Sequence, residues 1–316
     1  MRAAQIVRCG TPPVAADLPE PEPSPTSVLV EVLAAPITPL DLLCASGTSY
    51  FGVPPTPYVP GVQGVGRYDG RTVWFPTSAG MAPGDGSMAQ RVAVLASDLV
   101  ELPSGADPVG VAAAGLSAVA AYAALTWTGA LTAGERVVVL GAGVVGQAAI
   151  QLARSAGAEL VVAAARSAAA QRRAEAAGAD VVVPLDSDDV DELARRFAAA
   201  CPDGADLVLD GLFGAPAAAA LRALRPGGRL VNLGSSAGET APFDSATLRS
   251  RSLRVLGYTN NALTPADRAA AVRTIAEAID GGRLVVAREV VPLEEVTAAW
   301  ERQAAGAAEG RIVLTP

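Results

Sequence analysis

The residues best suited to chemistry in this chain are three glycines spaced as in a phosphate-binding turn. Gly141, Gly143 and Gly146 follow a run of aliphatic residues and precede a sequence with helical periodicity. An aliphatic strand, a GxGxxG turn and an amphipathic helix are the parts of a dinucleotide-binding βαβ unit. The first glycine permits a tight turn, the second lets backbone N–H groups approach a pyrophosphate, and the third lets helix and strand pack closely. The start of the helix, at Val144 and Val145, directs its partial positive charge toward the phosphates.

The end of the next strand distinguishes between the two common nicotinamide cofactors. NAD sites usually place Asp or Glu there, whereas this strand ends in three alanines and is followed by Arg166 and Ser167. A guanidinium can donate two charge-assisted hydrogen bonds to a 2′-phosphate, so the sequence predicts NADP(H) rather than NAD(H). Arg172 and Arg173 lie one to two turns further on and either join that site or form a solvated helix face. The alternative for the whole stretch is a glycine-rich turn in another kind of α/β domain.

The composition removes several other kinds of chemistry. The chain has 316 residues, no histidine, and 24 basic residues that are all arginine. Imidazole catalysis, lysine Schiff bases and histidine-ligated metals are therefore excluded. A net charge of −8 argues against nucleic acid and anionic membranes as partners. Cys9, Cys44 and Cys201 show no CxxC spacing, and residues 1–9 show no signal-peptide pattern, so we expect a cytoplasmic protein.

The order of patterns along the chain predicts an α/β protein with two domains. Residues 1–108 contain short strands between prolines and turns, as in a small β-rich, barrel-like domain. Residues 109–255 alternate strand and helix, which predicts a doubly wound parallel sheet. Residues 256–316, with a helix capped by Thr264 and Pro265, are expected to return to the N-terminal domain. The strands expected in the middle part are 136–141, 159–164, 181–184, 206–210, 229–233 and 254–257, and the helices are 144–156, 168–177, 189–200 and 215–224.

One uncharged segment, residues 108–134, is long enough to cross a membrane. It consists mostly of alanine and glycine, includes hydroxyl side chains, and leads directly into the strand before the glycine turn. We therefore predict a buried helix near the nucleotide domain rather than a membrane span.

Several short motifs occur in a fixed order on both sides of the glycine turn. They are Thr38-Pro39-Leu40-Asp41 before Gly47, Pro60–Gly66, Gly86–Ala89, Gly115–Ala118, Asp210-Gly211, Pro226–Val231 and Gly310–Leu314. The ordered set, which spans essentially the whole chain, resembles the zinc-independent quinone oxidoreductase and enoyl reductase branch of the medium-chain dehydrogenase/reductase superfamily. The resemblance implies a GroES-like catalytic domain (1–108), a Rossmann NADP-binding domain (109–255) and a returning C-terminal segment (256–316). It also implies a homodimer, formed through the edge of the nucleotide-domain sheet.

The chain departs from the superfamily's zinc enzymes at its metal positions. Thr38 stands where the reductase branch often has Asn and the zinc enzymes have a ligand cysteine, and Gln63 stands where an acid is usual. The Gly-His-Glu motif and the four-cysteine lobe of the zinc enzymes are absent, and Cys44 lies past the ligand position, as a buried thiol would. The resemblance therefore implies a metal-free enzyme, which lacks the Lewis acid of simple alcohol oxidation.

The reaction implied by the resemblance is transfer of a hydride from NADPH to a quinone or an α,β-unsaturated carbonyl. An enone that accepts hydride needs a hydrogen-bond donor at its oxygen and a proton at its α-carbon. Tyr50 lies in the segment where enoyl reductases of this family carry a tyrosine proton donor, although the family spacing from Gly47 is one residue tighter. The alternative is a loop tyrosine that only lines the pocket. Ser117 either donates to the nicotinamide region or caps its helix.

The remaining site residues are also placed by resemblance. Those expected on the cofactor side are Asn232, Gly234, Ser235 and Asn260, with Asn261 beside them. Asp41 is expected to fix its loop rather than transfer a proton, because a carboxylate would repel an enolate. The aromatic residues expected either to line a substrate cleft or to belong to the core are Tyr58, Trp74 and Phe75.

Three functions follow from these observations. The first is an NADPH-dependent reductase of small quinones or enones. The second is a reductase of carbonyls or enoyl thioesters in a biosynthetic pathway. The third is an NADPH-binding redox sensor without turnover, which the residues at 38 and 63 keep open.

Overall fold

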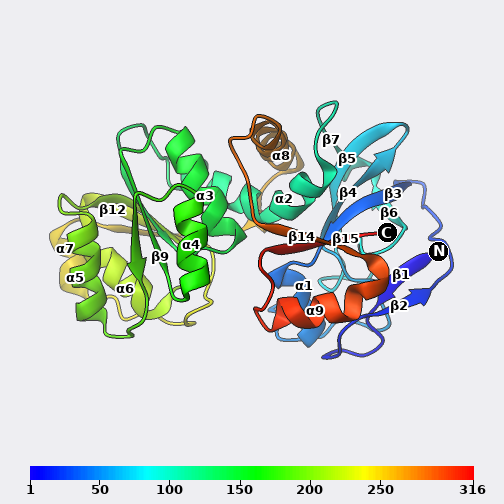
Figure 1. Ribbon diagram of the computed structural model, residues 1–316, viewed down its shortest axis with the longest axis horizontal. Coiled ribbons are helices and arrows are strands. Elements are labelled where there is room, and N and C mark those ends of the chain that lie inside the picture. Colours follow the sequence, from blue (N-terminus) through cyan, green and yellow to red (C-terminus); the bar gives the residue numbers. More distant parts are fainter. The chain divides into compact units, whose positions relative to one another are not determined.

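The computed structural model describes residues 1–316 and divides them into two compact units (Figure 1). Unit 1 comprises Met1–Gly115, Thr264–Gly282 and Val286–Pro316, and unit 2 comprises Leu116–Leu263 and Arg283–Val285. These limits differ from the predicted ranges 1–108, 109–255 and 256–316. The first half of a long helix belongs to unit 1, and the loop after the last parallel strand belongs to unit 2.

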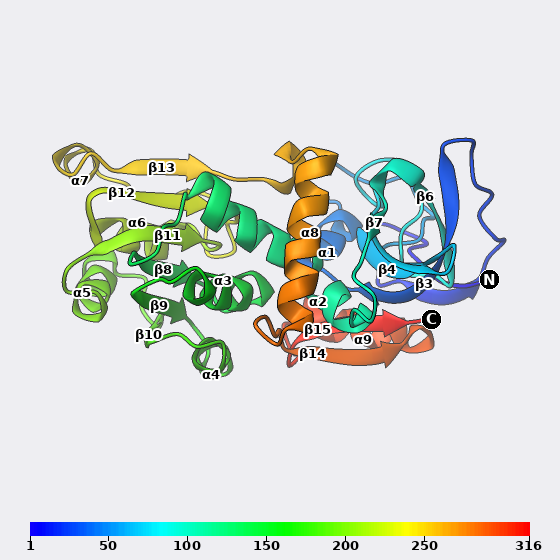
Figure 2. The same ribbon diagram turned by 90° about the horizontal axis from the view of Figure 1, so that it is seen from above.

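Unit 2 is built on a six-stranded parallel sheet, which confirms the predicted doubly wound architecture. The strand order is β10-β9-β8-β11-β12-β13 (Figure 2). The sequence order turns back at β8, and ligands of such sheets bind outside the carboxyl ends of the strands at that point. The strands are β8 (Arg136–Leu140), β9 (Leu160–Ala165), β10 (Val181–Pro184), β11 (Ala205–Asp210), β12 (Leu224–Asn232) and β13 (Arg254–Gly257).

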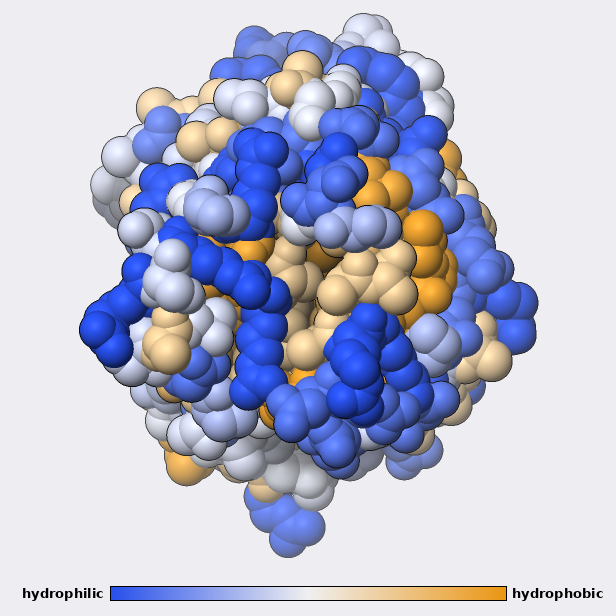
Figure 3. All heavy atoms as spheres, turned by 90° about the vertical axis from the view of Figure 1, so that its left-hand side faces the viewer, coloured by the Kyte–Doolittle hydropathy of each residue, from blue (hydrophilic) through white to orange (hydrophobic).

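Helices cover both faces of this sheet because its strands are apolar on both sides. One face carries α3 (Val144–Ser155) and α4 (Ala168–Ala176), and the other carries α5 (Val190–Ala200) and α6 (Gly214–Arg222). The short helix α7 (Ser245–Ser250) precedes β13. The side of the molecule toward α5, α6 and α7 is largely hydrophilic, with apolar side chains gathered in a central hollow (Figure 3).

Unit 1 contains a seven-stranded mixed sheet in the order β14-β15-β3-β4-β5-β7, with β6 also paired to β3. The C-terminal strand β15 pairs antiparallel with β3, so the tail completes the N-terminal sheet. The strands are β3 (Ser27–Pro36), β4 (Gln63–Tyr68), β5 (Arg71–Pro76), β6 (Arg91–Leu95), β7 (Val100–Glu101), β14 (Arg288–Pro292) and β15 (Arg311–Thr315), and the separate pair is β1 (Arg2–Gln5) and β2 (Val14–Asp17).

The helices of unit 1 pack around this sheet. Its α-helices are α1 (Pro39–Ser46), the first part of α2 (Pro108–Ala123), α8 (Pro265–Asp280) and α9 (Val296–Ala304). The helix α8 begins as predicted, because Thr264 accepts a hydrogen bond from Asp267 N–H and Pro265 occupies the first position. Single 3₁₀ turns lie at Ala96–Asp98, Leu293–Glu295 and, in unit 2, Asn260–Ala262.

The uncharged segment forms a broken helix rather than a regular one. Helix α2 is interrupted at Gly115, whose φ of 34° and ψ of −135° favour glycine. A π-helix, Ala124–Thr128, continues the helix to residue 128. The stretch Pro108–Thr128 has the length and apolar composition of a membrane span, but 72% of its most apolar window is buried inside the protein. Such burial is the usual state of a core helix.

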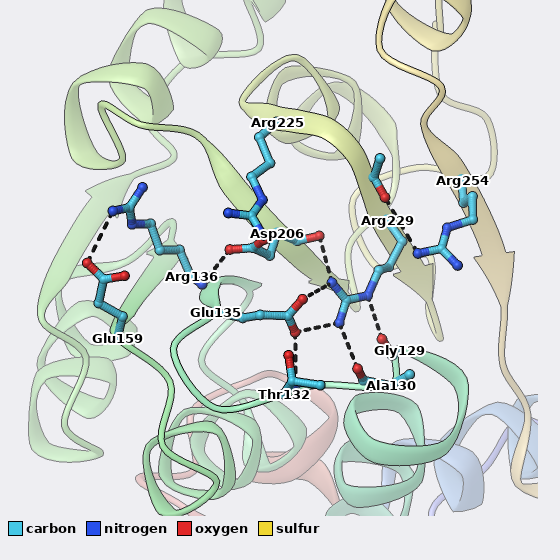
Figure 4. A network of polar contacts seen from close by, with 11 residues as sticks. Gly129, Ala130, Thr132, Glu135, Arg136, Glu159, Asp206, Arg225, Arg229 and Arg254 are labelled. Atoms are coloured by element: carbon cyan, nitrogen blue, oxygen red, sulfur yellow. Dashed lines mark hydrogen bonds and ion pairs between the residues drawn. The ribbon is translucent and has the colours of Figure 1, made fainter.

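A buried charge network fixes the amino ends of the parallel strands (Figure 4). Arg229 in β12 donates all five of its N–H groups: two to the Glu135 carboxylate at 2.7 Å, and the others to the carbonyls of Gly129, Ala130 and Asp206. The Asp206 carboxylate in turn pairs with Arg225. Because all five donors of Arg229 are satisfied, these interactions offset the cost of desolvating the guanidinium, and the network holds the end of the π-helix against the sheet.

Candidate functional site

The glycine turn lies at the carboxyl end of β8, and its first and third glycines are required by geometry. Gly141 has φ of 95°, in the left-handed region, and its N–H donates to Ala164 O at 2.8 Å. A Cβ on Gly146 would lie 2.8 Å from the carbonyl carbon of Gly141 and closer still to its oxygen. Only glycine at 146 therefore allows helix α3 to pack this closely against the turn.

The second glycine has a different environment. Gly143 is the N-cap of α3, provides no side-chain cap, and a Cβ placed there would meet nothing within 4 Å. The N–H groups of Val144 and Val145 belong to the first helical turn, where no intrahelical acceptor exists. No acidic residue lies in that turn. The open space in front of the helix thus suits an anionic group of the size of a phosphate.

Arginines and a helix start surround the carboxyl end of β9. Arg166 and Ser167 are exposed directly after the strand. Ser167 caps α4 by accepting from Ala170 N–H at 3.2 Å, so its hydroxyl hydrogen remains available to donate. Arg172 is exposed, but Arg173 is half-buried and its Nε lies 3.4 Å from Ala142 O. The guanidinium of Arg173 therefore lies against the glycine turn, which the sequence did not distinguish from a solvated helix face.

The ends of β11 and β12 are tied together by a buried carboxylate. Asn232 donates to Asp210 Oδ2 at 2.9 Å and to Gly234 O at 2.8 Å. The same carboxylate accepts from two backbone N–H groups of the loop after β11. Burial raises the pKa of Asp210, and these hydrogen bonds oppose that rise. Ser235 bonds to the Glu239 carboxylate at 2.7 Å. Hydrogen bonds thus fix the positions of Asn232, Gly234 and Ser235 at the carboxyl edge of the sheet.

The loop after β13 is joined to the second half of α2. Tyr258 donates its hydroxyl hydrogen to Asn260 Oδ1 at 2.7 Å, and Asn260 Nδ2 donates to Leu116 O at 3.1 Å. Burial raises the pKa of Tyr258 to about 12, so the hydroxyl stays a donor. Ser117 follows Leu116 in the same helical turn and is half-buried. The structure therefore brings the predicted residues Ser117 and Asn260 to neighbouring places in unit 2.

A second cluster lies in unit 1, around the start of α1. The side chains of Thr38 and Asp41 form a capping box, with Asp41 Oδ2 accepting from Thr38 N–H at 2.8 Å. Asp41 Oδ1 accepts from Gly61 N–H at 3.1 Å and from Val62 N–H at 2.9 Å. Burial raises the pKa of Asp41, opposed by these hydrogen bonds. This carboxylate fixes two loops, as expected from the sequence.

The residues at the other unit 1 positions are mostly structural. Gln63 is buried, and its Oε1 accepts from Trp74 Nε1 at 3.0 Å. Trp74, Phe75 and Tyr58 are all buried, the first two completely, so they belong to the core of unit 1. Tyr50, in contrast, is 80% exposed, and its ring stacks on Phe51 with centroids 4.3 Å apart.

The donors that could bind a metal are scattered. No group of three or more Cys, Asp or Glu side chains lies close enough to hold a metal ion. All three cysteines are free thiols, and burial raises the pKa of Cys44 to about 11, which disfavours the thiolate that metals bind.

Comparison with known proteins places this geometry in a family. Residues 144–277 match the family described as zinc-binding dehydrogenase. A quinone oxidoreductase from Lama guanicoe is 30% identical over 330 residues, which cover 99% of this chain and 97% of that protein. A quinone oxidoreductase from Thermus thermophilus, solved also as its complex with NADPH, is 32% identical with a TM-score of 0.80 over 100% of both chains. A polyketide synthase system protein from Streptomyces orinoci is 42% identical over 107 residues, 34% of this chain and 5% of that protein.

The fold and the glycine turn therefore agree with relatives that match the chain over essentially its full length. The chain belongs to the quinone oxidoreductase branch of the medium-chain dehydrogenase/reductase superfamily, an oxidoreductase family.

Proposed function

We propose that this protein is an NADPH-dependent, metal-free oxidoreductase that transfers hydride to a quinone or an α,β-unsaturated carbonyl. In this proposal, unit 2 carries the cofactor. The observation that carries the proposal is the glycine turn, in which Gly143 opens onto empty space before the helix while Gly141 and Gly146 are sterically fixed. The NADPH complex of the Thermus thermophilus relative supports it.

The residues present fit the cofactor at both of its charged groups. The pyrophosphate is held by the N–H groups at the start of α3, where Val144 and Val145 lie and where a side chain on Gly143 would intrude. The 2′-phosphate is held by Arg166 and the Ser167 hydroxyl, which are exposed at the start of α4. No carboxylate at this strand end repels that phosphate, which favours NADPH over NADH.

Two further arginines have separate roles in the proposal. Arg173 lies against the carbonyl of Ala142 and so presents positive charge beside the turn. Arg172 is exposed and contributes only long-range charge. The nicotinamide half is bordered by the residues at the later strand ends and in α2, namely Asn232, Gly234, Ser235, Asn260 and Ser117.

NADPH, when bound, supplies the hydride, so the chain has to position the acceptor and provide a proton. With neither histidine nor lysine available, the side-chain proton donor we propose is the Tyr50 hydroxyl. Its exposure of 80% allows the proton to be replaced from water between turnovers. Asp41 has no part in proton transfer, because its oxygens are already engaged by Thr38, Gly61 and Val62.

Metal independence is part of the proposal and rests on the donor set. Thr38 occupies the position where the zinc enzymes have a ligand cysteine. Gln63 stands where an acid is usual, and its amide oxygen is engaged by Trp74. Without a Lewis acid, oxidation of simple alcohols is disfavoured, whereas conjugated acceptors react because their carbonyl already delocalises the developing charge.

A second candidate, an enoyl-thioester reductase, is favoured by one observation. The segment shared with a polyketide synthase system protein is more similar than any full-length relative named above. An enone and an enoyl thioester share cofactor and proton chemistry and differ in the group attached to the carbonyl.

A spectrophotometric assay separates these functions. NADPH absorbance is followed with a quinone, an enone, an enoyl thioester, an aldehyde, and no acceptor. Consumption with the quinone or enone supports the first proposal, and consumption with the thioester alone supports the second. Tight NADPH binding without consumption by any acceptor would replace both with a sensor.

A further inference from the structure

A side chain on the cofactor helix grips a distant stretch of backbone. Gln151 in α3 donates from Nε2 to Val285 O at 2.7 Å and accepts from Val285 N–H at its Oε1 at 2.8 Å. The carboxamide thus meets both polar groups of one residue, as a neighbouring strand residue does in an antiparallel ladder. The two residues are 134 positions apart in sequence.

The gripped stretch has an unusual place in the chain. Arg283–Val285 belongs to unit 2, although the residues on both sides of it, up to Gly282 and from Val286 onward, belong to unit 1. Gly282 has φ of 66°, so the chain turns sharply as it enters the stretch. Arg283–Val285 is therefore a three-residue segment of unit 2 inserted before β14, and Gln151 bonds to its last residue, Val285.

The same carboxamide is connected to the glycine turn. Gln151 Nε2 also donates to Gln147 O at 2.9 Å, and Gln147 Nε2 donates to Ala142 O at 3.3 Å. Ala142 lies between the two glycines that shape the turn, and Arg173 contacts the same carbonyl. A continuous hydrogen-bonded row along one face of α3 thus runs from the turn to Val285.

We propose that Gln151 is a positioning residue, whose carboxamide holds Arg283–Val285 against α3. Through this contact, the local stability of Arg283–Val285 is coupled to ligand binding at the glycine turn. The coupling rests on the proposed function, because it takes the turn to be the NADPH pyrophosphate site. The grip itself is independent of any ligand. Since Val285 is 58% exposed, the bonds add little to overall stability, and variants at Gln151 should fold.

The first test is amide hydrogen exchange at Val285 in the unliganded protein. Gln151→Met, which keeps the length and removes both bonds, should speed exchange about tenfold, the effect of losing one hydrogen bond. Gln151→Glu keeps an acceptor for the N–H but sets a carboxylate oxygen against the carbonyls of Val285 and Gln147, so it should also speed exchange. Gln303→Met, whose amide accepts instead from Ile312 N–H, should change nothing at Val285. Unchanged exchange in Gln151→Met, or equal acceleration in Gln303→Met, would overturn the grip.

The second test uses NADPH and exploits thermodynamic reciprocity. If Gln151→Met raises the NADPH Kd about threefold, NADPH must slow Val285 exchange in wild type by the same factor and must lose that effect in the variant. An unchanged Kd together with unchanged protection would refute the coupling while leaving the grip in place. If wild type fails to bind NADPH, the proposed function fails instead, and the exchange result without ligand still decides the grip.

Discussion

Alanine at the second glycine of the turn should weaken NADPH binding without loss of stability, whereas alanine at the third should destabilise the fold. At Gly143 a Cβ meets nothing within 4 Å, and the backbone, with φ of −69° and ψ of −171°, suits alanine. Replacing an N-cap glycine by alanine loses about 0.5–1 kcal/mol, which is offset by the lower entropy of the unfolded chain. We therefore expect the free energy of unfolding of Gly143→Ala to stay within about 0.5 kcal/mol of wild type.

NADPH affinity, unlike stability, should fall in Gly143→Ala. The alanine methyl of Gly143→Ala points into the space assigned to the pyrophosphate, so the ligand must shift or lose its bonds to the α3 N–H groups. We expect the NADPH Kd to rise at least about 100-fold, which corresponds to about 2.7 kcal/mol of binding free energy. Calorimetric titration measures the Kd, and urea denaturation measures the stability.

Gly146→Ala should damage folding first. Its Cβ would lie 2.8 Å from the Gly141 carbonyl carbon. The optimal separation of two non-bonded carbon atoms is about 3.5–4.0 Å. Alanine gains about 1 kcal/mol of helix propensity, but overpacking against a backbone that cannot yield costs about 1–3 kcal/mol or more. Because the contact is with backbone, the cost lies at the upper end of that range, and the net expectation is a loss of about 2 kcal/mol or more of unfolding free energy, with weakened NADPH binding. A Gly143→Ala protein that binds NADPH like wild type would refute the pyrophosphate assignment.

Five other predictions test separate parts of the account. Arg166→Ala should raise the NADPH KM about 10- to 100-fold, the loss expected for charge-assisted hydrogen bonds, and leave the NADH KM nearly unchanged; equal increases would exclude a 2′-phosphate role. Tyr50→Phe should lower enone turnover by roughly 10²-fold if the hydroxyl donates the proton, and an unchanged rate would exclude it. Metal analysis should detect no stoichiometric zinc, whereas one zinc per chain would contradict metal independence. Arg229→Met, which leaves the half-buried Glu135 carboxylate without its cation, should lower the free energy of unfolding by about 1–3 kcal/mol in urea denaturation. Burial raises the pKa of Glu135, but hydrogen bonds from Arg229 and Thr132 N–H outweigh this effect and leave the pKa below 4.5. The free energy of unfolding of wild type should therefore exceed that of Glu135→Gln by less as the pH falls through the lowered pKa. A difference that grows toward low pH would contradict this sign.

Much of unit 2 could be predicted because its elements are signalled locally. Parallel strands buried on both faces read as continuous apolar runs, and β8, β9, β10 and β13 lie within one residue of the predicted ranges. The glycine turn was predictable because two of its three glycines are required by backbone geometry alone.

The unit boundaries could not be predicted, because they depend on contacts between distant segments. The break in α2 falls at Gly115, where a Cβ would overlap the side chain of Gln63, and nothing near residue 115 signals that contact. Arg283–Val285 likewise belongs to unit 2, where Val285 is hydrogen-bonded to Gln151, 134 residues earlier in the chain.

The candidate site divides in the same way. Arg166 follows a strand end and could be assigned from position alone, whereas the contact of Arg173 with Ala142 depends on how α4 packs beside the turn. For Trp74 and Phe75 the sequence favoured the core but left a place in the cleft open, and their complete burial decides for the core. The only available signal for Gln147 and Gln151 was their spacing of four residues on one helix, which places both on the same face.

The most direct test of the central claim is calorimetric titration of the wild-type protein with NADPH and with NADH in the same buffer. The account predicts one NADPH per chain, bound at least about tenfold more tightly than NADH, a difference of about 1.4 kcal/mol. Absence of binding by both dinucleotides, or tighter binding of NADH, would contradict it.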